Sequence, residues 1–187
     1  DIILVAAGLV IAAGSFRGLV YSRPGYGHST PRPHDVRWQP DFMHRQARLV
    51  LPALFEVLAI NADADVDADP PWLFGHSDGG SIALIYAASF PDRVAGLVVL
   101  APHLFVEQEG IDSIVAAREA WMLSDFRSKL ARQHDDVAAA LRCGNDSWRG
   151  LDCRCRRLET LLPAATMTIR GHSGHDPGHE QILGTLG

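Results

Sequence analysis

Short, continuous apolar runs alternate with amphipathic segments along the first hundred residues of the chain. The four runs are residues 2–5, 18–21, 72–74 and 94–100. Because they are apolar on both faces and end at glycine, proline or polar residues, we predict buried parallel strands. A stripe of leucines at helical spacing predicts a helix from Pro40 to Ile60, and a small-residue-rich segment predicts another from Gly79 to Phe90. The leucines of the stripe are Leu49, Leu51, Leu54 and Leu58.

The order strand, helix, strand predicts the fold class. Repeated units of this kind form a mostly parallel sheet with helices on both faces, so we expect an α/β protein. From residue 105 to 161 the pattern changes to long polar–apolar helical repeats, which we interpret as a helical insertion within a single domain over residues 1–187. A weak strand at 166–170 and the loop GHSGHDPGHE come after it.

Composition and charge exclude several classes of protein. Hydrophobic residues make up 47% of the 187 residues, charged residues 21%, and the net charge is −5, as in ordinary globular proteins. We therefore expect no nucleic-acid partner. The apolar run DIILVAAGLVIAAG begins with an acid and is shorter than the roughly 20 residues that cross a bilayer, so we expect a buried strand and no membrane partner.

The cysteines favour a reducing compartment. The chain has three, Cys143, Cys153 and Cys155, an odd number without the spacings of a disulfide framework. We therefore expect a cytoplasmic protein. Cys153 and Cys155 also lack the two-residue spacer of most structural zinc sites.

The segment Phe74-Gly75-His76-Ser77-Asp78-Gly79-Gly80 carries the clearest chemistry. It fits G-x-S-x-G between a predicted strand and a predicted helix, which is the context of a nucleophile elbow. Glycines on either side of Ser77 remove Cβ atoms that would clash in so sharp a bend. Ser77 is therefore the predicted nucleophile, and the backbone N–H of Asp78, at the helix start, is the predicted donor to an oxyanion.

Two segments resemble one family. GHSDGGSIALIYAASFPDRVAGLVVLAP is similar to the nucleophile-elbow segment of the α/β-hydrolase superfamily, and YSRPGYGHSTP is similar to a loop after an earlier strand in the same proteins. The resemblance covers residues 18–102 and implies an α/β-hydrolase fold in which residues 105–161 form the cap. A serine nucleophile resembles the esterase, lipase and peptidase branches, which implies no cofactor.

The resemblance also implies a base, an acid and a second oxyanion donor. In this family the order is serine, acid, histidine, and Gly171-His172-Ser173-Gly174-His175 is similar to the histidine-bearing loop, so His172 is the candidate base. In a second register the same segment replaces the acid-bearing loop, and the histidine would lie beyond the end of this chain. The acid is left open: Asp176, close to the histidines in sequence, is the candidate, and Asp125, Asp146 and Asp152, which precede the histidines as the family order requires, are the alternatives. Leu9, in VAAGL, is the candidate second oxyanion donor.

Two hypotheses about function result. The first is a carboxylesterase-like serine hydrolase that cleaves an ester or related acyl bond in a small substrate through an acyl-enzyme on Ser77. The alternative is a catalytically incomplete, non-enzymatic α/β-hydrolase-like protein or fragment. We expect no metal, because His172, His175 and His179 are interrupted by Pro177 and Gly178. The sequence leaves open whether the chain forms a homo-oligomer.

Overall fold

A computed structural model describes residues 18–33, 39, 41–60, 70–104, 108–123 and 125–141. The described residues fall into two compact units. Those within Asp41–Leu104 form the first, which we call the sheet unit. Those within Leu19–Pro40 and Phe105–Arg156 form the second, which we call the helical unit. The expectation of a single domain with an insertion at 105–161 stays a prediction.

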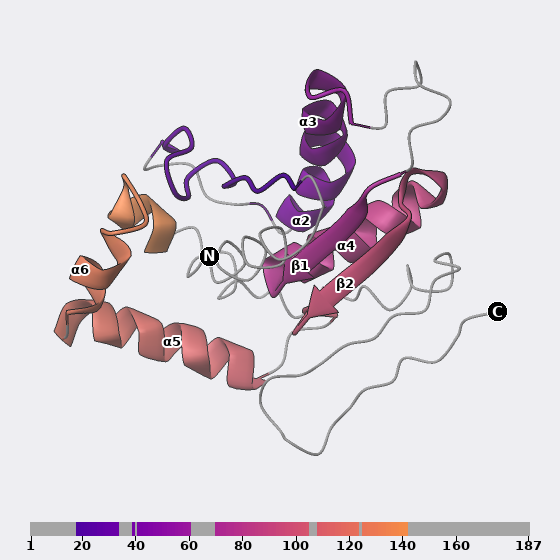
Figure 1. Ribbon diagram of the computed structural model, residues 1–187. Coiled ribbons are helices and arrows are strands. Elements are labelled where there is room, and N and C mark those ends of the chain that lie inside the picture. The colour runs from indigo at the N-terminus through magenta and orange to yellow at the C-terminus, as the bar shows by residue number, and fades with distance from the viewer. Residues whose placement is uncertain are drawn as a thin grey trace. The chain divides into compact units, whose positions relative to one another are not determined.

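The sheet unit is built on a parallel strand pair. Strands β1 (Trp72–His76) and β2 (Gly96–Leu100) pair in register from Trp72 opposite Gly96 to His76 opposite Leu100. Helix α4 (Asp78–Ser89) and the 3-10 turn η2 (Pro91–Arg93) connect them (Figure 1). The predicted strand–helix–strand unit and its parallel sheet are confirmed.

Helix α4 is the centre of this unit. It contacts both strands on one side and two helical segments, α2 and η1, on another. Its residues from Gly80 to Ala87 are all buried, which explains why the segment is rich in small and apolar residues rather than amphipathic. Where α4 meets the sheet, Ala83, Leu84 and Val99 form a buried cluster.

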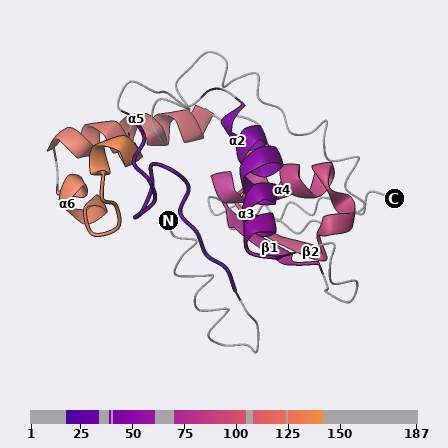
Figure 2. The same cartoon turned by 90° about the horizontal axis from the view of Figure 1, so that it is seen from above.

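The predicted helix from Pro40 to Ile60 exists, but its middle turn is wider. It consists of α2 (Phe42–Arg45), the π-helical turn η1 (Gln46–Val50) and α3 (Leu51–Val57), which Figure 2 shows as one rod. A π turn holds an extra residue, so it rotates the later residues relative to their positions in a regular helix. The predicted leucine stripe is therefore wrong in part, because Leu51 is buried whereas Leu49 is 58% and Leu58 45% exposed.

An aromatic contact links the rod to α4. The rings of Phe55 and Tyr86 meet edge to face with their centroids 5.6 Å apart, and Tyr86 also packs on Phe90 at 5.0 Å. Phe55 is 6% and Tyr86 1% exposed, so these rings are part of the core. Such pairs contribute about 0.5–1.5 kcal/mol beyond the area they bury.

The helical unit contains α5 (Gln108–Leu123), α6 (Phe126–Leu130) and a turn of helix at 137–141. The predicted helical character is confirmed over the described part of 105–161; residues 142–161 and the predicted strands at 2–5 and 166–170 lie outside it. No helix in the described part of the chain is long and apolar enough to cross a membrane.

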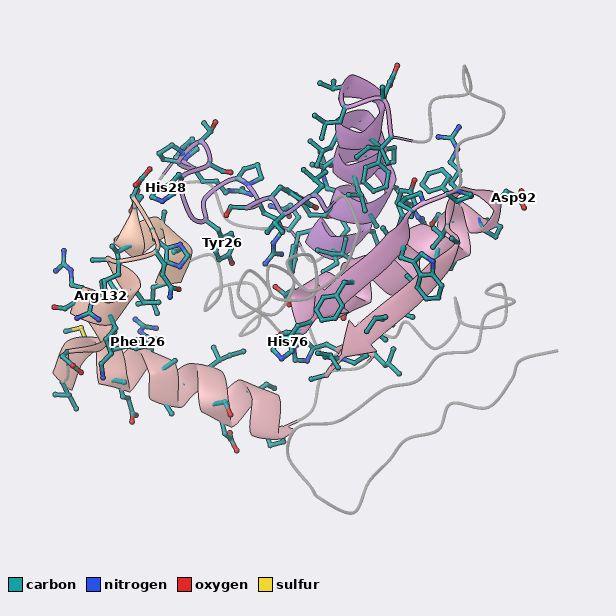
Figure 3. All side chains as sticks on the ribbon, viewed as in Figure 1. Tyr26, His28, His76, Asp92, Phe126 and Arg132 are labelled. Atoms are coloured by element: carbon teal, nitrogen blue, oxygen red, sulfur yellow. The ribbon has the colours of Figure 1, made fainter. Side chains whose placement is uncertain are left out.

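The strand predicted at 18–21 is wrong. Residues 18–23 have no regular structure, and Leu19 is 45% exposed. A strand needs a neighbour to bind its N–H and C=O groups, and both described strands pair only with each other. The loop after residue 23 is held by the segment at 134–135: Gly27 N–H donates to His134 Nδ1 at 2.9 Å, and His28 contacts Asp135 at 2.8 Å. Figure 3 labels Tyr26 and His28 in this loop.

Candidate active site

The turn between β1 and α4 consists of a single residue, Ser77. Strand β1 ends at His76 and α4 begins at Asp78, and Figure 3 labels His76 at this end of the strand. To make the turn, Ser77 adopts φ 55° and ψ −124°. Residues other than glycine rarely occupy this region, and each such residue costs on the order of 1–3 kcal/mol. Ser77 is therefore held in a strained conformation by its surroundings.

Glycines make the sharp bend possible. A Cβ atom on Gly75 would lie 2.5 Å from the carbonyl carbon of Gly79 and 2.6 Å from the backbone nitrogen of Gly80. These are backbone atoms, which cannot rotate away. A Cβ on Gly80 would lie 3.3 Å from both the Gly75 oxygen and the Pro102 Cβ. The predicted reason for the glycines, removal of Cβ atoms from a tight elbow, agrees with this geometry.

The backbone of Ser77 is anchored on both sides. Its N–H donates to the carbonyl oxygen of Leu100 at 2.9 Å, which extends the β1–β2 hydrogen bonding by one residue. Its carbonyl oxygen accepts the N–H of Ser81 at 3.1 Å, the first hydrogen bond of α4. Ser77 is thus fixed between the end of the sheet and the start of the helix.

The hydroxyl of Ser77 does not form the hydrogen bond that the hydroxyl of an N-cap serine usually forms. Ser77 is the N-cap of α4, and N-cap serines ordinarily accept a hydrogen bond from an N–H of the first helical turn. Here the side chain makes no cap hydrogen bond. Its Oγ instead lies 2.8 Å from Nε2 of His103. The elbow therefore presents the hydroxyl to an imidazole rather than to its own helix.

His103 reaches Ser77 from the end of the neighbouring strand. It lies three residues after Leu100, the last residue of β2, and the chain turns at Ala101, which has φ 45°. Ser81, in the first turn of α4, then holds the backbone of His103. Its hydroxyl accepts the His103 N–H at 2.8 Å and donates to the His103 carbonyl oxygen at 3.0 Å.

The other predicted site residues are placed only in part. Asp78 is the first residue of α4, so its N–H belongs to the helical turn that carries partial positive charge, and its role as an oxyanion donor stays a prediction. Leu9, His172 and Asp176 lie outside the described residues, and their roles stay predictions as well. His76 is paired with Leu100 within the sheet.

Sequence reasoning missed His103. A signal was present, because His103 comes three residues after the end of the predicted strand 94–100, just as Ser77 comes three residues after the end of the predicted strand 72–74. Neighbouring parallel strands end at the same edge of a sheet, which is where α/β proteins bind their ligands. A histidine within a few residues of the second strand's end was therefore a candidate partner for the serine.

The chemistry that this arrangement allows is proton transfer at a nucleophile. A serine hydroxyl 2.8 Å from an imidazole nitrogen is within the reach of general-base catalysis. Over the ranges that the structure describes, no group of three or more His, Cys, Asp or Glu side chains lies close enough together to hold a metal ion. The histidines at 172, 175 and 179 are not among these residues.

The comparison with protein families agrees with the geometry. A model of the alpha/beta hydrolase fold matches residues 7–144, which is most of the chain. The matched region includes both strands, the elbow at Ser77, His103 and helices α5 and α6. The serine-centred turn at the end of a parallel strand is the feature that the G-x-S-x-G motif produces in this fold. The chain belongs to the alpha/beta hydrolase fold family.

Proposed function

We propose that this protein is a serine hydrolase that cleaves an ester or related acyl bond in a small substrate through an acyl-enzyme on Ser77. One observation carries the proposal: in a strained N-cap, the Ser77 hydroxyl lies 2.8 Å from His103 Nε2 instead of capping its helix. Backbone strain of this kind persists only where the surrounding structure imposes it, and it is concentrated at functional sites.

The elbow supplies two of the requirements of acyl transfer. A hydroxyl is almost wholly protonated at neutral pH, so it attacks a carbonyl only when a neighbouring base accepts its proton. An imidazole at hydrogen-bond distance meets that requirement. The attack places negative charge on the carbonyl oxygen, and the N–H of Asp78, at the positive end of α4, is the donor we assign to it.

The same contact argues against the alternative of an elbow without a working base. That alternative requires that no histidine reach Ser77, and His103 reaches it. With φ 55° and ψ −124°, Ser77 does not have the extended backbone from which N-cap side chains usually bond their helix, and its hydroxyl lies beside His103 instead.

A fluorophosphonate probe tests the proposal directly. The wild-type protein should be labelled on Ser77, identified by peptide mass spectrometry, and Ser77→Ala should not be labelled. Ser128→Ala, which changes an exposed serine in α6, is the matched control and should be labelled like wild type. A folded wild-type protein without label, or equal labelling of Ser77→Ala, contradicts the proposal. p-Nitrophenyl esters of increasing acyl length then define the substrate.

A further inference from the structure

We propose that His134 is a pH-sensitive latch: its neutral imidazole holds the loop at residues 22–30 against the segment at 133–136, and its protonation releases that loop. Both segments belong to the helical unit. The contact joins residues 107 positions apart in the sequence and includes neither Ser77 nor His103. The proposal therefore goes beyond the proposed function and does not depend on it.

The loop at 22–30 is closed by hydrogen bonds of its own. The Gly25 N–H donates to the carbonyl oxygen of Thr30 at 2.9 Å, and the hydroxyl of Ser29 donates to the carbonyl oxygen of Ser22 at 2.6 Å. These hydrogen bonds do not involve the segment at 133–136. The loop can therefore keep its own conformation when it separates from that segment.

Gly27 is the residue through which the loop is attached. Its N–H donates to Nδ1 of His134 at 2.9 Å, and its carbonyl oxygen accepts the N–H of Asp135 at 3.0 Å. Gly27 has φ 58°, and a Cβ atom there would lie 2.8 Å from Cβ of Ser22, so another residue would not fit without a shift. Both backbone polar groups of this glycine are thus bound by two consecutive residues of the other segment.

Protonation of His134 would remove the acceptor in this contact. A backbone N–H can only donate, so Nδ1 of His134 must present a lone pair to Gly27 and carry no proton. In a protonated imidazole both nitrogens are donors, and two N–H groups would face each other across 2.9 Å. His134 is 6% exposed, so water cannot take the place of the lost acceptor while the loop stays in position. The loop must therefore move away.

The environment of His134 favours its neutral form while the loop is closed. Burial lowers the pKa of His134 below the ordinary 6.5, and nearby positive charge, including that of His28, lowers it further. The ring of Tyr26 covers the imidazole edge to face, with centroids 6.1 Å apart, and the guanidinium of Arg23 lies over the same tyrosine. Release of the loop would end this burial and raise the pKa again. Protonation and release are therefore linked, and the loop is closed above the lowered pKa and released as the pH falls through it.

One contact of the loop responds to pH in the opposite direction. His28, labelled in Figure 3, lies with its Nδ1 2.8 Å from the Asp135 carboxylate, and a protonated His28 would pair with that carboxylate more strongly. The two side chains are 81% and 59% exposed, and exposed ion pairs contribute little. The buried imidazole of His134 therefore decides the direction of the change.

The other charged groups of the segment and of α6 are engaged elsewhere or exposed to solvent. Asp136 accepts the Ala139 N–H, Lys129 pairs with Asp125, Arg127 lies over Trp121, and Arg132 is exposed. Asp136 is thus occupied at the start of the helical turn at 137–141, where its carboxylate is 2.8 Å from the N–H that it accepts. Among these groups, the structure provides no carboxylate contact to His134 that would compensate a buried positive charge.

The test measures amide hydrogen exchange by NMR between pH 5 and 7.5. Each rate is compared with the intrinsic rate at the same pH, which gives a protection factor. In the wild-type protein the protection of Gly27 and Asp135 should fall together as the pH drops. The fall should be about tenfold for each pH unit between the pKa values of His134 in the closed and the released loop. Gly25, whose N–H binds within the loop, should keep its protection.

Three variants identify the group responsible. His134→Asn does not titrate and still offers an amide oxygen as acceptor, so the protection of Gly27 should no longer depend on pH. His134→Ala has no acceptor, so Gly27 and Asp135 should exchange rapidly at every pH. His28→Asn is the matched control, because it removes the exposed pair with Asp135 and should leave the fall in Gly27 protection in place.

Several results would overturn the proposal. Constant protection of Gly27 in the folded wild-type protein would do so, and so would a fall that persists in His134→Asn. If Gly25 loses protection together with Gly27, the loop unfolds instead of being released. The ring proton signals of His134, followed in the same wild-type samples, give its pKa without any substitution, and a value at or above 6.5 also contradicts the latch. None of these measurements uses the activity of Ser77, so the proposed function can fail or hold independently.

Discussion

The strain at Ser77 can be measured by exchanging one small side chain for another. Ser77→Ala and Ser77→Gly both remove the hydroxyl and its contact with His103, so they differ only in the Cβ atom. At φ 55° and ψ −124° that Cβ is unfavourable in alanine and absent in glycine. The difference between the two free energies of unfolding therefore reports the backbone strain, once the greater freedom of glycine in the unfolded chain is taken into account.

The expected magnitude results from two opposing terms. Relief of the strained conformation stabilises the glycine variant by about 1–3 kcal/mol. The greater freedom of glycine in the unfolded chain destabilises it by about 0.5–1 kcal/mol. Ser77→Gly should therefore be more stable than Ser77→Ala by as much as about 2.5 kcal/mol, in the direction opposite to the usual effect of glycine.

The assay is urea unfolding followed by circular dichroism and tryptophan fluorescence, with both variants fitted with a common slope. Ala88→Gly, within the regular part of α4, is the control and should lose about 0.5–1 kcal/mol relative to wild type. If Ser77→Gly is less stable than Ser77→Ala by the amount that Ala88→Gly loses, the elbow holds no strain and the argument for a functional turn is refuted.

Two further predictions concern other parts of the chain. Gly75→Ala should destabilise the protein by about 1–3 kcal/mol and abolish probe labelling, because the added Cβ would collide with the backbone of Gly79 and Gly80. The control is Gly110→Ala in α5, where an added Cβ meets nothing within 4 Å, and it should stabilise the protein by about 0.5–1 kcal/mol. Equal effects of the two substitutions in urea unfolding would contradict the steric argument. Burial of His134, together with the smaller effect of positive charge on His28, holds its pKa below the ordinary 6.5. The unfolded chain then binds a proton that the folded protein excludes, so the free energy of unfolding should fall as the pH drops below about 6.5 and level off below the folded pKa. His134→Asn, which does not titrate, should show a flatter dependence between pH 7.5 and 5; an unchanged slope would contradict the assignment.

Local sequence was sufficient to predict the elbow. The apolar run before Ser77 and the small-residue segment after it predicted β1 and α4, and glycines in the G-x-S-x-G motif predicted the bend between them. These features depend on residues that are neighbours along the chain, because a Cβ on Gly75 collides with Gly79 only four residues away. The family resemblance stated over residues 18–102 is confirmed by the family model that matches residues 7–144.

Structural features that depend on residues far apart in the sequence were predicted less well. The apolar run at 18–21 has the composition of a strand, but a strand exists only where another strand binds its backbone. Leucine spacing predicted the helix at 42–57 but not which leucines are buried, because the π turn η1 rotates the later residues.

The amino-acid sequence by itself determined the parallel strand–helix–strand unit and the identity of Ser77 as its turn residue, because short-range sterics and hydrophobic burial suffice for both. Only the tertiary structure decided which imidazole lies beside Ser77. That contact requires β1 and β2 to be neighbours, a turn at Ala101, and the hydroxyl of Ser81 to hold the backbone of His103. Since the pairing of β1 with β2 brings their carboxyl ends together, a histidine 26 residues from the serine comes within hydrogen-bond distance of its hydroxyl.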